Sequence, residues 1–322
     1  KCILCRRCVA MCNKVQSVGV IGANYRGFNT TIGCAFDRSL GAVDCVACGQ
    51  CVAVCPTGAL HEREEIDNVR DAIADPEKVV VVAAAPAVRA AIGEEFGYPI
   101  GTNTEGKMFT AMRMLGFDKV FDVNFAADLT IMEEANELLD RVSNKGVLPM
   151  FTSCSPGWIR YVEYYYPELI PNLSSCKSPM QMFGATVKTY YAQKEGIDPK
   201  NIYVVGVMPC TAKKFERTRD DQSASGYPDI DAVLTTRELA KMIRTAGILY
   251  NELPDGTFDN PLGEFTGAGV IFGATGGVME AALRTAAETI TGKSLDAVDY
   301  KAVRGMQGIK EAEYDLNGLK VK

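Results

Sequence analysis

The chain has 322 residues, of which 47% are hydrophobic and 23% are charged, so it can bury the cores of two or three domains. Its net charge of −6 gives no basic footprint for nucleic acid, and its longest apolar run, residues 79–87, is too short to cross a bilayer. The single histidine, His61, excludes Ser-His-Asp and Cys-His catalysis elsewhere in the chain. We therefore expect chemistry based on cysteines, carboxylates, lysines and bound metal, with neither nucleic acid nor a membrane as partner.

The first sixty residues contain two cysteine runs of one spacing. Each run follows the pattern C-x2-C-x2-C-x3-C, from Cys2 to Cys12 and from Cys45 to Cys55. In such a pair of runs, three cysteines of one run bind one [4Fe–4S] cluster, and the fourth binds the other cluster. We therefore predict two clusters, one held by Cys2, Cys5, Cys8 and Cys55 and the other by Cys45, Cys48, Cys51 and Cys12.

A zinc ribbon or a disulfide framework is the alternative for these cysteines. Zinc knuckles use paired C-x2-C units and usually histidines, and two four-cysteine runs exceed what tetrahedral zinc needs. No hydrophobic signal peptide is visible, and cysteines on adjacent turns would form poor disulfides. We therefore favour two clusters in a cytoplasmic protein, although Asn13 follows Cys12 where a proline is frequent.

The hydrophobic pattern divides the rest of the chain. Residues 1–60 are expected to form a small α+β ferredoxin-like domain, and residues 61–77 a helical link. Short apolar runs then alternate with helical stretches, which indicates an α/β fold with parallel sheets flanked by helices. A break near residues 196–200 separates two predicted lobes, 78–198 and 199–322. The predicted strands are 79–85, 119–123, 147–151, 202–207, 232–235 and 269–272, and the predicted helices are 129–142, 180–193, 236–246 and 278–290.

Two further cysteines follow predicted strands. Cys154 comes just after strand 147–151, and Cys210 just after strand 202–207. Parallel sheets bind ligands at the carboxyl ends of their strands, so a cleft between the lobes could hold a thiolate-bound metal centre. Proline in both loops and the cations of Lys213 and Lys214 beside Cys210 favour this interpretation over two buried free thiols.

Four longer strings resemble those of the iron-only (di-iron) hydrogenases. They are TSCSPGW at 152–158, MPCTAKKFE at 208–216, AVLTTRELA at 232–240 and GVIFGATGGVME at 269–280. The resemblance covers the whole chain and implies an enzyme that interconverts dihydrogen with protons and electrons. It implies an H-cluster, which is a [4Fe–4S] cubane joined through a cysteine sulfur to a di-iron unit with carbon monoxide and cyanide ligands. The implied partners are ferredoxin or an NAD(P)-linked subunit as redox partner, and maturation proteins for the di-iron unit.

The resemblance also implies roles for residues around that centre. Cys210 corresponds to a ligand of the cubane, and Lys213 to the donor of a hydrogen bond to a cyanide of the di-iron unit. Met208 and Phe272 correspond to residues that wall the di-iron unit, and Pro86 lies on a loop that resembles its cyanide-contacting turn. A dry apolar wall suits a diatomic substrate and limits access by water.

A proton path is implied as well. By resemblance it starts at Cys154 and continues through Glu134, Ser174, Glu137 and Arg141 towards the surface. Independently of the family, Glu134 and Glu137 are three residues apart and Arg141 follows four residues later, so all three share one helix face. Without the resemblance, a solvated helix face with one ion pair is the alternative.

Four features depart from the family pattern. Ser155 stands where a second cysteine usually binds the cubane, so Ser155 binds through its oxygen, another group replaces it, or the cubane is altered. Cys176 stands where a small residue is common and is a candidate ligand, proton carrier or buried free thiol, and Met180 replaces a frequent glutamine. The family's last cysteine-rich loop should follow residue 322, and the chain starts at Lys1, so we expect a fragment with part of the active-site shell and remaining ligands beyond its end.

Three other functions compete with a hydrogenase. A cluster-assembly protein would keep the fold and the cubanes without a di-iron unit, but the intact string at 208–216 and the glutamate stripe argue against it. A hydrogen sensor would bind the same cofactor and turn over slowly, and this segment does not separate it from an enzyme. An electron-carrying subunit would leave two α/β lobes without a purpose.

Overall fold

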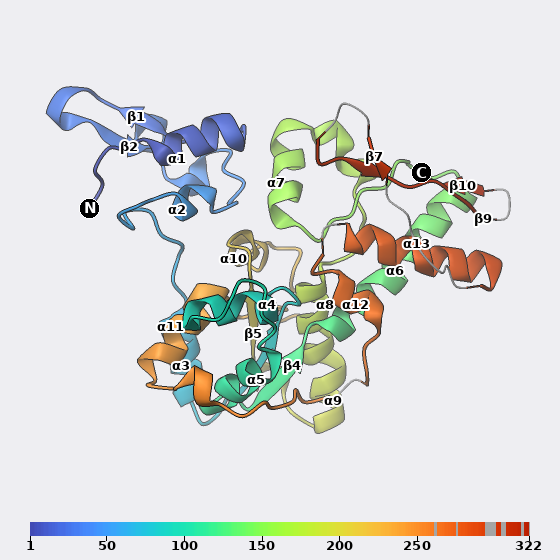
Figure 1. Cartoon of the computed structure of the whole chain (residues 1–322). Helices are drawn as coiled ribbons and strands as arrows, with labels where there is room; N and C mark the ends of the chain where they lie inside the picture. The colour runs from blue at the N-terminus through green and yellow to red at the C-terminus, as the bar shows by residue number, and fades with distance from the viewer. Residues whose placement is uncertain (261–262, 275, 294–300, 304–306, 317–318, 322) are drawn as a thin grey trace.

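A computed structural model describes residues 1–260, 263–274, 276–293, 301–303, 307–316 and 319–321. Figure 1 shows the first sixty residues, in blue, as a small unit beside a larger body that contains the parallel strands. A single chain segment descends from this unit into the larger body ahead of the first long helix. Within the described residues, no helix combines the length and the hydropathy needed to cross a bilayer.

The cluster domain, residues 1–60, is built around two short helices and a hairpin. Its regular elements are α1 (Arg7–Ala10), β1 (Gly22–Asn24), β2 (Thr31–Gly33) and α2 (Gln50–Ala53), with β1 and β2 antiparallel. Its core is small, because the buried residues that pack together are Cys8, Cys12 and Ile21, and the other buried apolar residues of the domain are Cys34 and Val46. The cohesion of this domain therefore depends on the cysteines themselves.

A four-stranded parallel sheet forms the centre of the larger body. Its strands are β3 (Val79–Ala84), β4 (Lys119–Asp122), β5 (Ile202–Met208) and β6 (Ala232–Thr235), in the order β4-β3-β5-β6. The two central strands pair from Val79 opposite Ile202 to Ala84 opposite Val207. All four confirm predicted strands, because continuous apolar runs suit strands that are covered on both faces.

Eleven α-helices follow the cluster domain in the described part of the chain. They are α3 (Ile66–Ala74), α4 (Val88–Ala91), α5 (Glu105–Met114), α6 (Asn124–Ser143), α7 (Pro156–Tyr165), α8 (Pro179–Thr186), α9 (Ala192–Glu195), α10 (Ala212–Glu216), α11 (Thr236–Thr245), α12 (Gly267–Ile271) and α13 (Gly277–Thr291). Near the C-terminus, β7 (Lys301–Ala302) pairs with β8 (Lys310–Glu311), and β9 (Tyr314–Leu316) pairs with β10 (Leu319–Val321). The four predicted helices are confirmed within α6, the α8–α9 stretch, α11 and α13.

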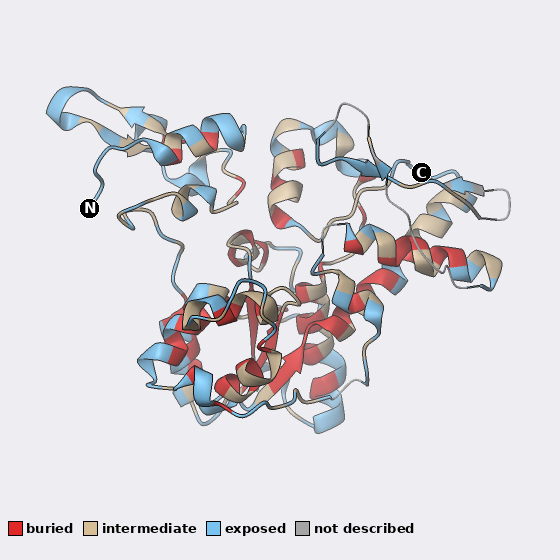
Figure 2. Ribbon diagram, in the orientation of Figure 1, coloured by how far each residue is buried: buried red, intermediate tan, exposed pale blue. Residues whose placement is uncertain are grey.

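Helices cover both faces of the sheet, and Figure 2 shows the strands and the helix segments around them in the red of buried residues. Val80 and Val82 of β3 pack against α3, α5 and α11 on one face, whereas Val81 and Ala83 pack against α6 and α8 on the other. Successive side chains of a strand point to opposite faces, so each strand contributes to both cores. The α/β class is therefore correct. Because helices cover both faces of the sheet, a ligand would have to bind at the ends of the strands.

One predicted strand, 147–151, does not form. Phe151 makes an isolated parallel bridge with Leu173, outside the four-stranded sheet. Pro149 lacks a backbone N–H, and Val147 and Leu148 are about half exposed, at 49% each. An apolar run that cannot donate to a ladder and remains in solvent does not form a central strand.

Another predicted strand, 269–272, is helical. Residues Gly267–Ile271 form α12, and the hydroxyl of Thr266 caps it by accepting from the N–H of Ala268. Asp128 of α6 accepts hydrogen bonds from the N–H groups of Thr266 and Gly269. Tertiary contacts with α6 thus stabilise a helix in a short apolar run that periodicity alone assigns equally well to a strand.

The two predicted lobes do not each contribute a parallel sheet to the described residues. Strands β3 and β4 lie in the first predicted lobe and β5 and β6 in the second, yet all four form one sheet. The cause is the stretch from α8 to α9, which covers one face and returns the chain to pair β5 with β3. The lobe boundaries stay a prediction, and part of the second range lies outside the described residues.

Candidate functional site

The two cysteine runs share one backbone conformation. Leu4 and Ala47 occupy the same place in their runs, and both have φ of 57°. The N–H of Leu4 lies 3.4 Å from the sulfur of Cys2, and the N–H of Ala47 lies 3.4 Å from the sulfur of Cys45. A left-handed non-glycine residue costs about 1–3 kcal/mol and persists where the surroundings impose it. The loops thus direct N–H groups at sulfur, as thiolate ligands require.

The cysteines of the second predicted cluster line one cavity. Its lining includes Cys12 from the first run and Cys45, Cys48 and Cys51 from the second. Valine and isoleucine side chains complete the wall. Burial, together with the neighbouring thiols of Cys48 and Cys45, raises the pKa of Cys51 to about 11. Four cysteines from both runs thus line one small apolar cavity, which suits the predicted second cluster.

The other predicted cluster lies nearer to solvent. Cys2 and Cys5 are exposed, whereas Cys8 is buried. Burial is the main cause that raises the pKa of Cys8, and the nearby thiols of Cys5 and Cys2 add to the rise. Cys55 differs, because backbone N–H groups, above all that of Leu60, lower its pKa to about 7. Hydrogen bonds to the charged form make Cys55 a ready thiolate ligand. Its assignment to the same cluster as the other three stays a prediction.

The carboxyl edge of the sheet brings together several residues with expected roles. Pro86 lies just after β3, Met208 ends β5, and Cys210 lies two residues further on. The chain leaves β3 towards β4 on one side and β5 towards β6 on the other, and ligands bind at such a switch point. Phe272 follows α12, and a Cβ on Gly273 would lie 3.4 Å from the Cβ of Pro86. The loops that carry Pro86 and Phe272 are therefore in contact.

One lysine joins the two cysteine-bearing loops of the larger body. Helix α10 begins after Cys210, and the ammonium of its Lys213 donates to the carbonyl oxygen of Cys154 at 2.8 Å. The same ammonium lies 3.0 Å from both carboxylate oxygens of Glu216, which also accepts from the hydroxyl of Ser178 at 2.9 Å. Burial raises the pKa of Cys154, and the nearby Lys213 opposes that rise. Glu216 is not among the predicted site residues, although its i,i+3 spacing from Lys213 is a usable signal.

Three residues singled out in the sequence lie in unexpected surroundings. Ser155 is exposed at the start of α7. Met180 is buried against β5, where a Cβ on Gly206 would lie 3.1 Å from its sulfur. Lys214 does not accompany Lys213 towards Cys210, because its ammonium pairs with Glu238 at 2.8 Å. Consecutive helix residues point about 100° apart, so only one of the two lysines can face the cysteine loops.

Three residues of the expected proton path, Ser174, Glu137 and Arg141, are connected by hydrogen bonds, and Glu134 lies on the same helix face as Glu137; we call these four residues the stripe. The Ser174 hydroxyl donates to Oε2 of Glu137 at 2.7 Å, and Arg141 donates to Oε1 of Glu137 at 2.6 Å. Burial alone would raise the pKa of Glu137, but hydrogen bonds from Ser174 and Arg141 help to lower it. The Cys176 thiol lies 3.6 Å from the same carboxylate. Glu134 is 1% exposed, so this helix face is largely buried rather than solvated.

Several buried polar atoms near this stripe and the carboxyl edge lack partners. Within the described residues, neither carboxylate oxygen of Glu134 forms a hydrogen bond, and the same holds for Oε1 of Gln181 and the side-chain amide of Asn124. Such a group costs about 1–3 kcal/mol when left unsatisfied, so native proteins rarely keep one without a reason. Asn124 begins α6 just after β4, and Gln181 donates to Glu216 at 3.5 Å. These atoms fit a site that receives a further polar group.

The titration of Glu134 can be observed directly. Burial is the main cause that raises its pKa to about 7, so we expect a neutral carboxyl at about pH 6 and a carboxylate at about pH 8. Difference infrared spectra of the wild type and Glu134→Gln should show a protonated-carboxyl band that disappears across this range. Glu137→Gln is the matched control and should retain the band, because the pKa of Glu137 is lowered. A wild type without the band at about pH 6 contradicts the assignment.

Residues 45–49 of the second cysteine run, which we call the inner cysteine loop, lie against the loop that carries Cys210. The hydroxyl of Thr211 donates to the carbonyl oxygen of Ala47 at 2.9 Å. A Cβ on Gly49, whose φ is +71°, would lie 2.3 Å from the Thr211 hydroxyl oxygen, so only glycine fits there. The Tyr165 hydroxyl of α7 donates to the carbonyl oxygen of Val18 at 3.1 Å. No local sequence pattern indicates this junction, because its partners lie up to 164 residues apart.

Known proteins match both parts of the chain. Residues 78–322 match the family "Iron only hydrogenase large subunit, C-terminal domain", and residues 1–59 match a "4Fe-4S dicluster domain". The NADP-reducing hydrogenase subunit HndD of Solidesulfovibrio fructosivorans is 54% identical over 319 residues, which are 97% of this chain and 54% of that protein. Iron hydrogenase 1 of Clostridium pasteurianum is 52% identical over 320 residues, which are 99% of this chain and 56% of that protein.

Solved structures agree with these matches. An apo [FeFe]-hydrogenase HydA1 from Chlamydomonas reinhardtii has a TM-score of 0.71 and 48% sequence identity, covering 78% of this chain and 65% of that chain. This chain spans about half the length of the curated relatives named above. From the family match and these identities, the chain belongs to the iron-only hydrogenase large subunits, with an N-terminal 4Fe–4S dicluster domain.

Proposed function

We propose that the protein interconverts dihydrogen with protons and electrons at an H-cluster. Membership of the family implies iron–sulfur clusters and an H-cluster. The observation that carries the proposal for this chain is the hydrogen-bonded series Ser174–Glu137–Arg141, with the buried carboxyl of Glu134, unpaired among the described residues, on the same face of α6, the helix that follows β4. When bound, the H-cluster supplies the chemistry that cleaves the H–H bond, and the protein supplies routes for protons and electrons.

The chain's residues would hold the H-cluster at the carboxyl edge of the sheet. Cys210 is the cubane ligand in this proposal, and Lys213 offers a hydrogen-bond donor to the di-iron unit. Pro86, Met208 and Phe272 would form the apolar wall. The contact between the Pro86 and Phe272 loops and the position of Met208 at the end of β5 support this arrangement.

Protons would move between Cys154 and the surface through the stripe. The Cys154 thiol exchanges a proton with Glu134, whose pKa of about 7 lets it both accept and release a proton at neutral pH. The Ser174 hydroxyl passes the proton onward to Glu137, to which it already donates a hydrogen bond. Arg141 holds the Glu137 carboxylate in place at the outer end.

Electrons would pass through the cluster domain. The cavity lined by Cys12, Cys45, Cys48 and Cys51 would hold the inner cluster, next to Thr211 and Cys210. The exposed Cys2 and Cys5 belong to the outer cluster, where ferredoxin or an NAD(P)-linked subunit would exchange electrons. The relative HndD is named as NADP-reducing, which favours a nicotinamide-linked partner. Dependence on maturation proteins for the di-iron unit and a cytoplasmic location are part of the same proposal.

Cys176 has two proposed roles that one variant separates. As a proton carrier it would act through its contact with Glu137, and as a ligand it would compensate for Ser155 at the cubane. We expect Cys176→Ala to lower turnover by about tenfold or more at unchanged iron content, which is modest for loss of a proton-transfer group. Ser175→Ala on the same loop is the control and should behave as the wild type. Altered cubane spectra would instead indicate a ligand, and normal spectra with full activity would remove Cys176 from the site.

Infrared spectra and isotope exchange of the matured full-length protein test the function. A hydrogenase shows bands of bound carbon monoxide and cyanide and exchanges dihydrogen with deuterium oxide at a high rate. A cluster-assembly protein would show cubanes without these bands, and a sensor would show the bands with slow exchange. Either of these two results would replace the proposed activity.

A further inference from the structure

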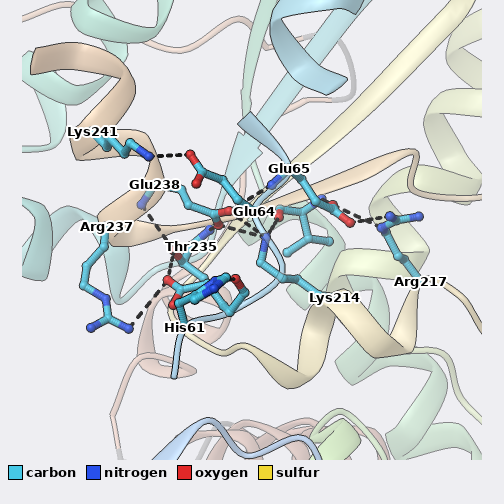
Figure 3. A network of polar contacts seen from close by, with 11 residues as sticks. His61, Glu64, Glu65, Lys214, Arg217, Thr235, Arg237, Glu238 and Lys241 are labelled. Carbon is cyan, nitrogen blue, oxygen red and sulfur yellow. Dashed lines mark hydrogen bonds and ion pairs between the residues drawn. The ribbon is translucent and has the colours of Figure 1, made fainter. Parts of the chain in front are cut away.

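The link between the two parts of the molecule is anchored by a buried carboxylate (Figure 3). Glu65 is 1% exposed, although it lies in a connecting segment. Its Oε2 accepts from Nε of Arg217 at 3.2 Å and from the backbone N–H of Val233 at 2.7 Å, and its Oε1 pairs with the Arg217 guanidinium. One side chain of the link thereby binds both the end of α10 and the start of β6.

A second buried carboxylate completes this anchor. Glu238 of α11 accepts from the N–H of Glu65 at 3.1 Å and from the ammonium of Lys214 at 2.8 Å. Two carboxylates thus face two cations, so the group is neutral overall and well satisfied by hydrogen bonds. We name Glu65, Lys214, Arg217 and Glu238 the clamp; it joins the link to α10, β6 and α11. Figure 3 shows these side chains converging from separate segments.

The neighbouring acid on the link lies in different surroundings. Glu64 pairs with Lys241 at 2.5 Å, but both side chains are about half exposed, at 49% and 55%. Exposed pairs contribute little to stability because water and salt screen them. Glu64 and Glu65 therefore form a matched pair within one segment, and only Glu65 belongs to the clamp.

The cluster domain has few other attachments to the larger body. Among the described residues, its core is separate from the two cores that flank the sheet. Its hydrogen bonds to the larger body come from Tyr165 and Thr211. Helix α10 directly follows Thr211, so the clamp fixes the element that carries the junction with Ala47. The position of the inner cysteine loop thus depends on the link and α10 being held together.

We propose that Glu65 is a positioning residue for electron transfer between the inner cysteine loop and the Cys210 loop. By locking the link to α10, it holds Ala47 against Thr211 without contacting either cysteine run. The connecting segment at Glu65, which we call the strut, thus holds the cluster domain in a fixed position instead of joining it flexibly. This inference rests on the proposed hydrogenase function and concerns only the electron route, so the two can fail separately.

The test compares Glu65→Gln with Glu64→Gln in the matured full-length protein. In Glu65→Gln, amide hydrogen exchange at residues 45–49 and 62–66 should be faster by on the order of ten- to a hundredfold, because charged hydrogen bonds are lost. The rate at which the reduced-cluster EPR signal appears after mixing with dihydrogen should fall by on the order of tenfold or more, since about 1 Å of misplacement is costly. Isotope exchange between dihydrogen and deuterium oxide should stay at the wild-type rate, and Glu64→Gln should match the wild type throughout.

Three outcomes would overturn the positioning role. Unchanged cluster reduction with faster amide exchange would mean that the strut does not govern electron transfer. A proportional fall in isotope exchange would mean that Glu65 supports the H-cluster site instead. If Glu65→Gln fails to fold, the charge-balanced Glu65→Gln/Arg217→Gln protein replaces it, and cluster reduction at the wild-type rate in that protein also overturns the role. A wild type without isotope exchange would contradict the proposed function itself.

Discussion

Replacing Glu137 with glutamine is expected to lower dihydrogen turnover by about a hundredfold or more, the size typical of losing a general acid–base group. Glutamine keeps the shape of the side chain, so the contacts with Ser174 and Arg141 can largely survive. Its amide cannot take up the proton that the Ser174 hydroxyl delivers to Oε2. Hydrogen evolution at about neutral pH, measured with iron content and infrared bands on the same sample, checks the prediction.

Glu133→Gln is the matched control for this experiment. Glu133 lies on the same helix, α6, but is exposed and outside the stripe. Its variant should keep wild-type turnover. Equal activity in Glu137→Gln and Glu133→Gln would show that the stripe is not the proton route, whereas a loss of infrared bands in Glu137→Gln would show a structural role.

The second large effect concerns stability. Lys214→Met should lower the free energy of unfolding by about 3 kcal/mol, because it leaves Glu238 as a buried carboxylate without its cation. Lys214 also donates to the carbonyl oxygen of Val233 at 2.6 Å, and this bond is lost as well. The loss lies at the lower end of the usual range, since Glu238 keeps hydrogen bonds from the N–H groups of Thr235 and Glu65. Urea unfolding monitored by circular dichroism measures it.

Lys241→Met removes the cation of the exposed neighbouring pair and serves as the comparison. Its cost should stay within about 1 kcal/mol, as for other solvent-exposed pairs. The double variant Lys214→Met/Glu238→Gln should recover part of the loss, because it removes the uncompensated charge. Equal destabilisation by the two lysine variants would mean that burial does not decide the strength of these pairs.

The local hydrophobic pattern predicted the secondary structure correctly where burial alone determines the conformation of a segment. Strands β3 and β5 are continuous apolar runs, and burial on both faces is the structure that satisfies them. The runs 147–151 and 269–272 are equally apolar but short, so a proline in the first and capping contacts from Asp128 in the second decided their structure. The joining of both predicted lobes in one sheet depends on pairing between segments more than 100 residues apart, which no local pattern specifies.

The residues discussed above also divide into those that local spacing predicts and those that depend on contacts between distant segments. The stripe of Glu134, Glu137 and Arg141 is visible in the sequence because helix spacing alone places them on one face. The clamp is not visible, because Glu65 meets Arg217 and Val233 across 152 and 168 residues. In the sequence, Glu65 is one acid of a charged segment beside Glu64, and only burial separates them. Residues that act across the molecule therefore required the structure.

The small core of the cluster domain has a consequence for the order of assembly. Five buried apolar residues cannot offset the chain entropy of sixty, and three of the five are themselves cysteines, two of them from the runs. Metal binding is therefore part of the folding free energy of this domain, as in other small metal-dependent domains. Iron supply would then act as a checkpoint in biogenesis: a nascent chain short of iron completes its parallel sheet but presents an unfolded N-terminal segment to cellular proteases.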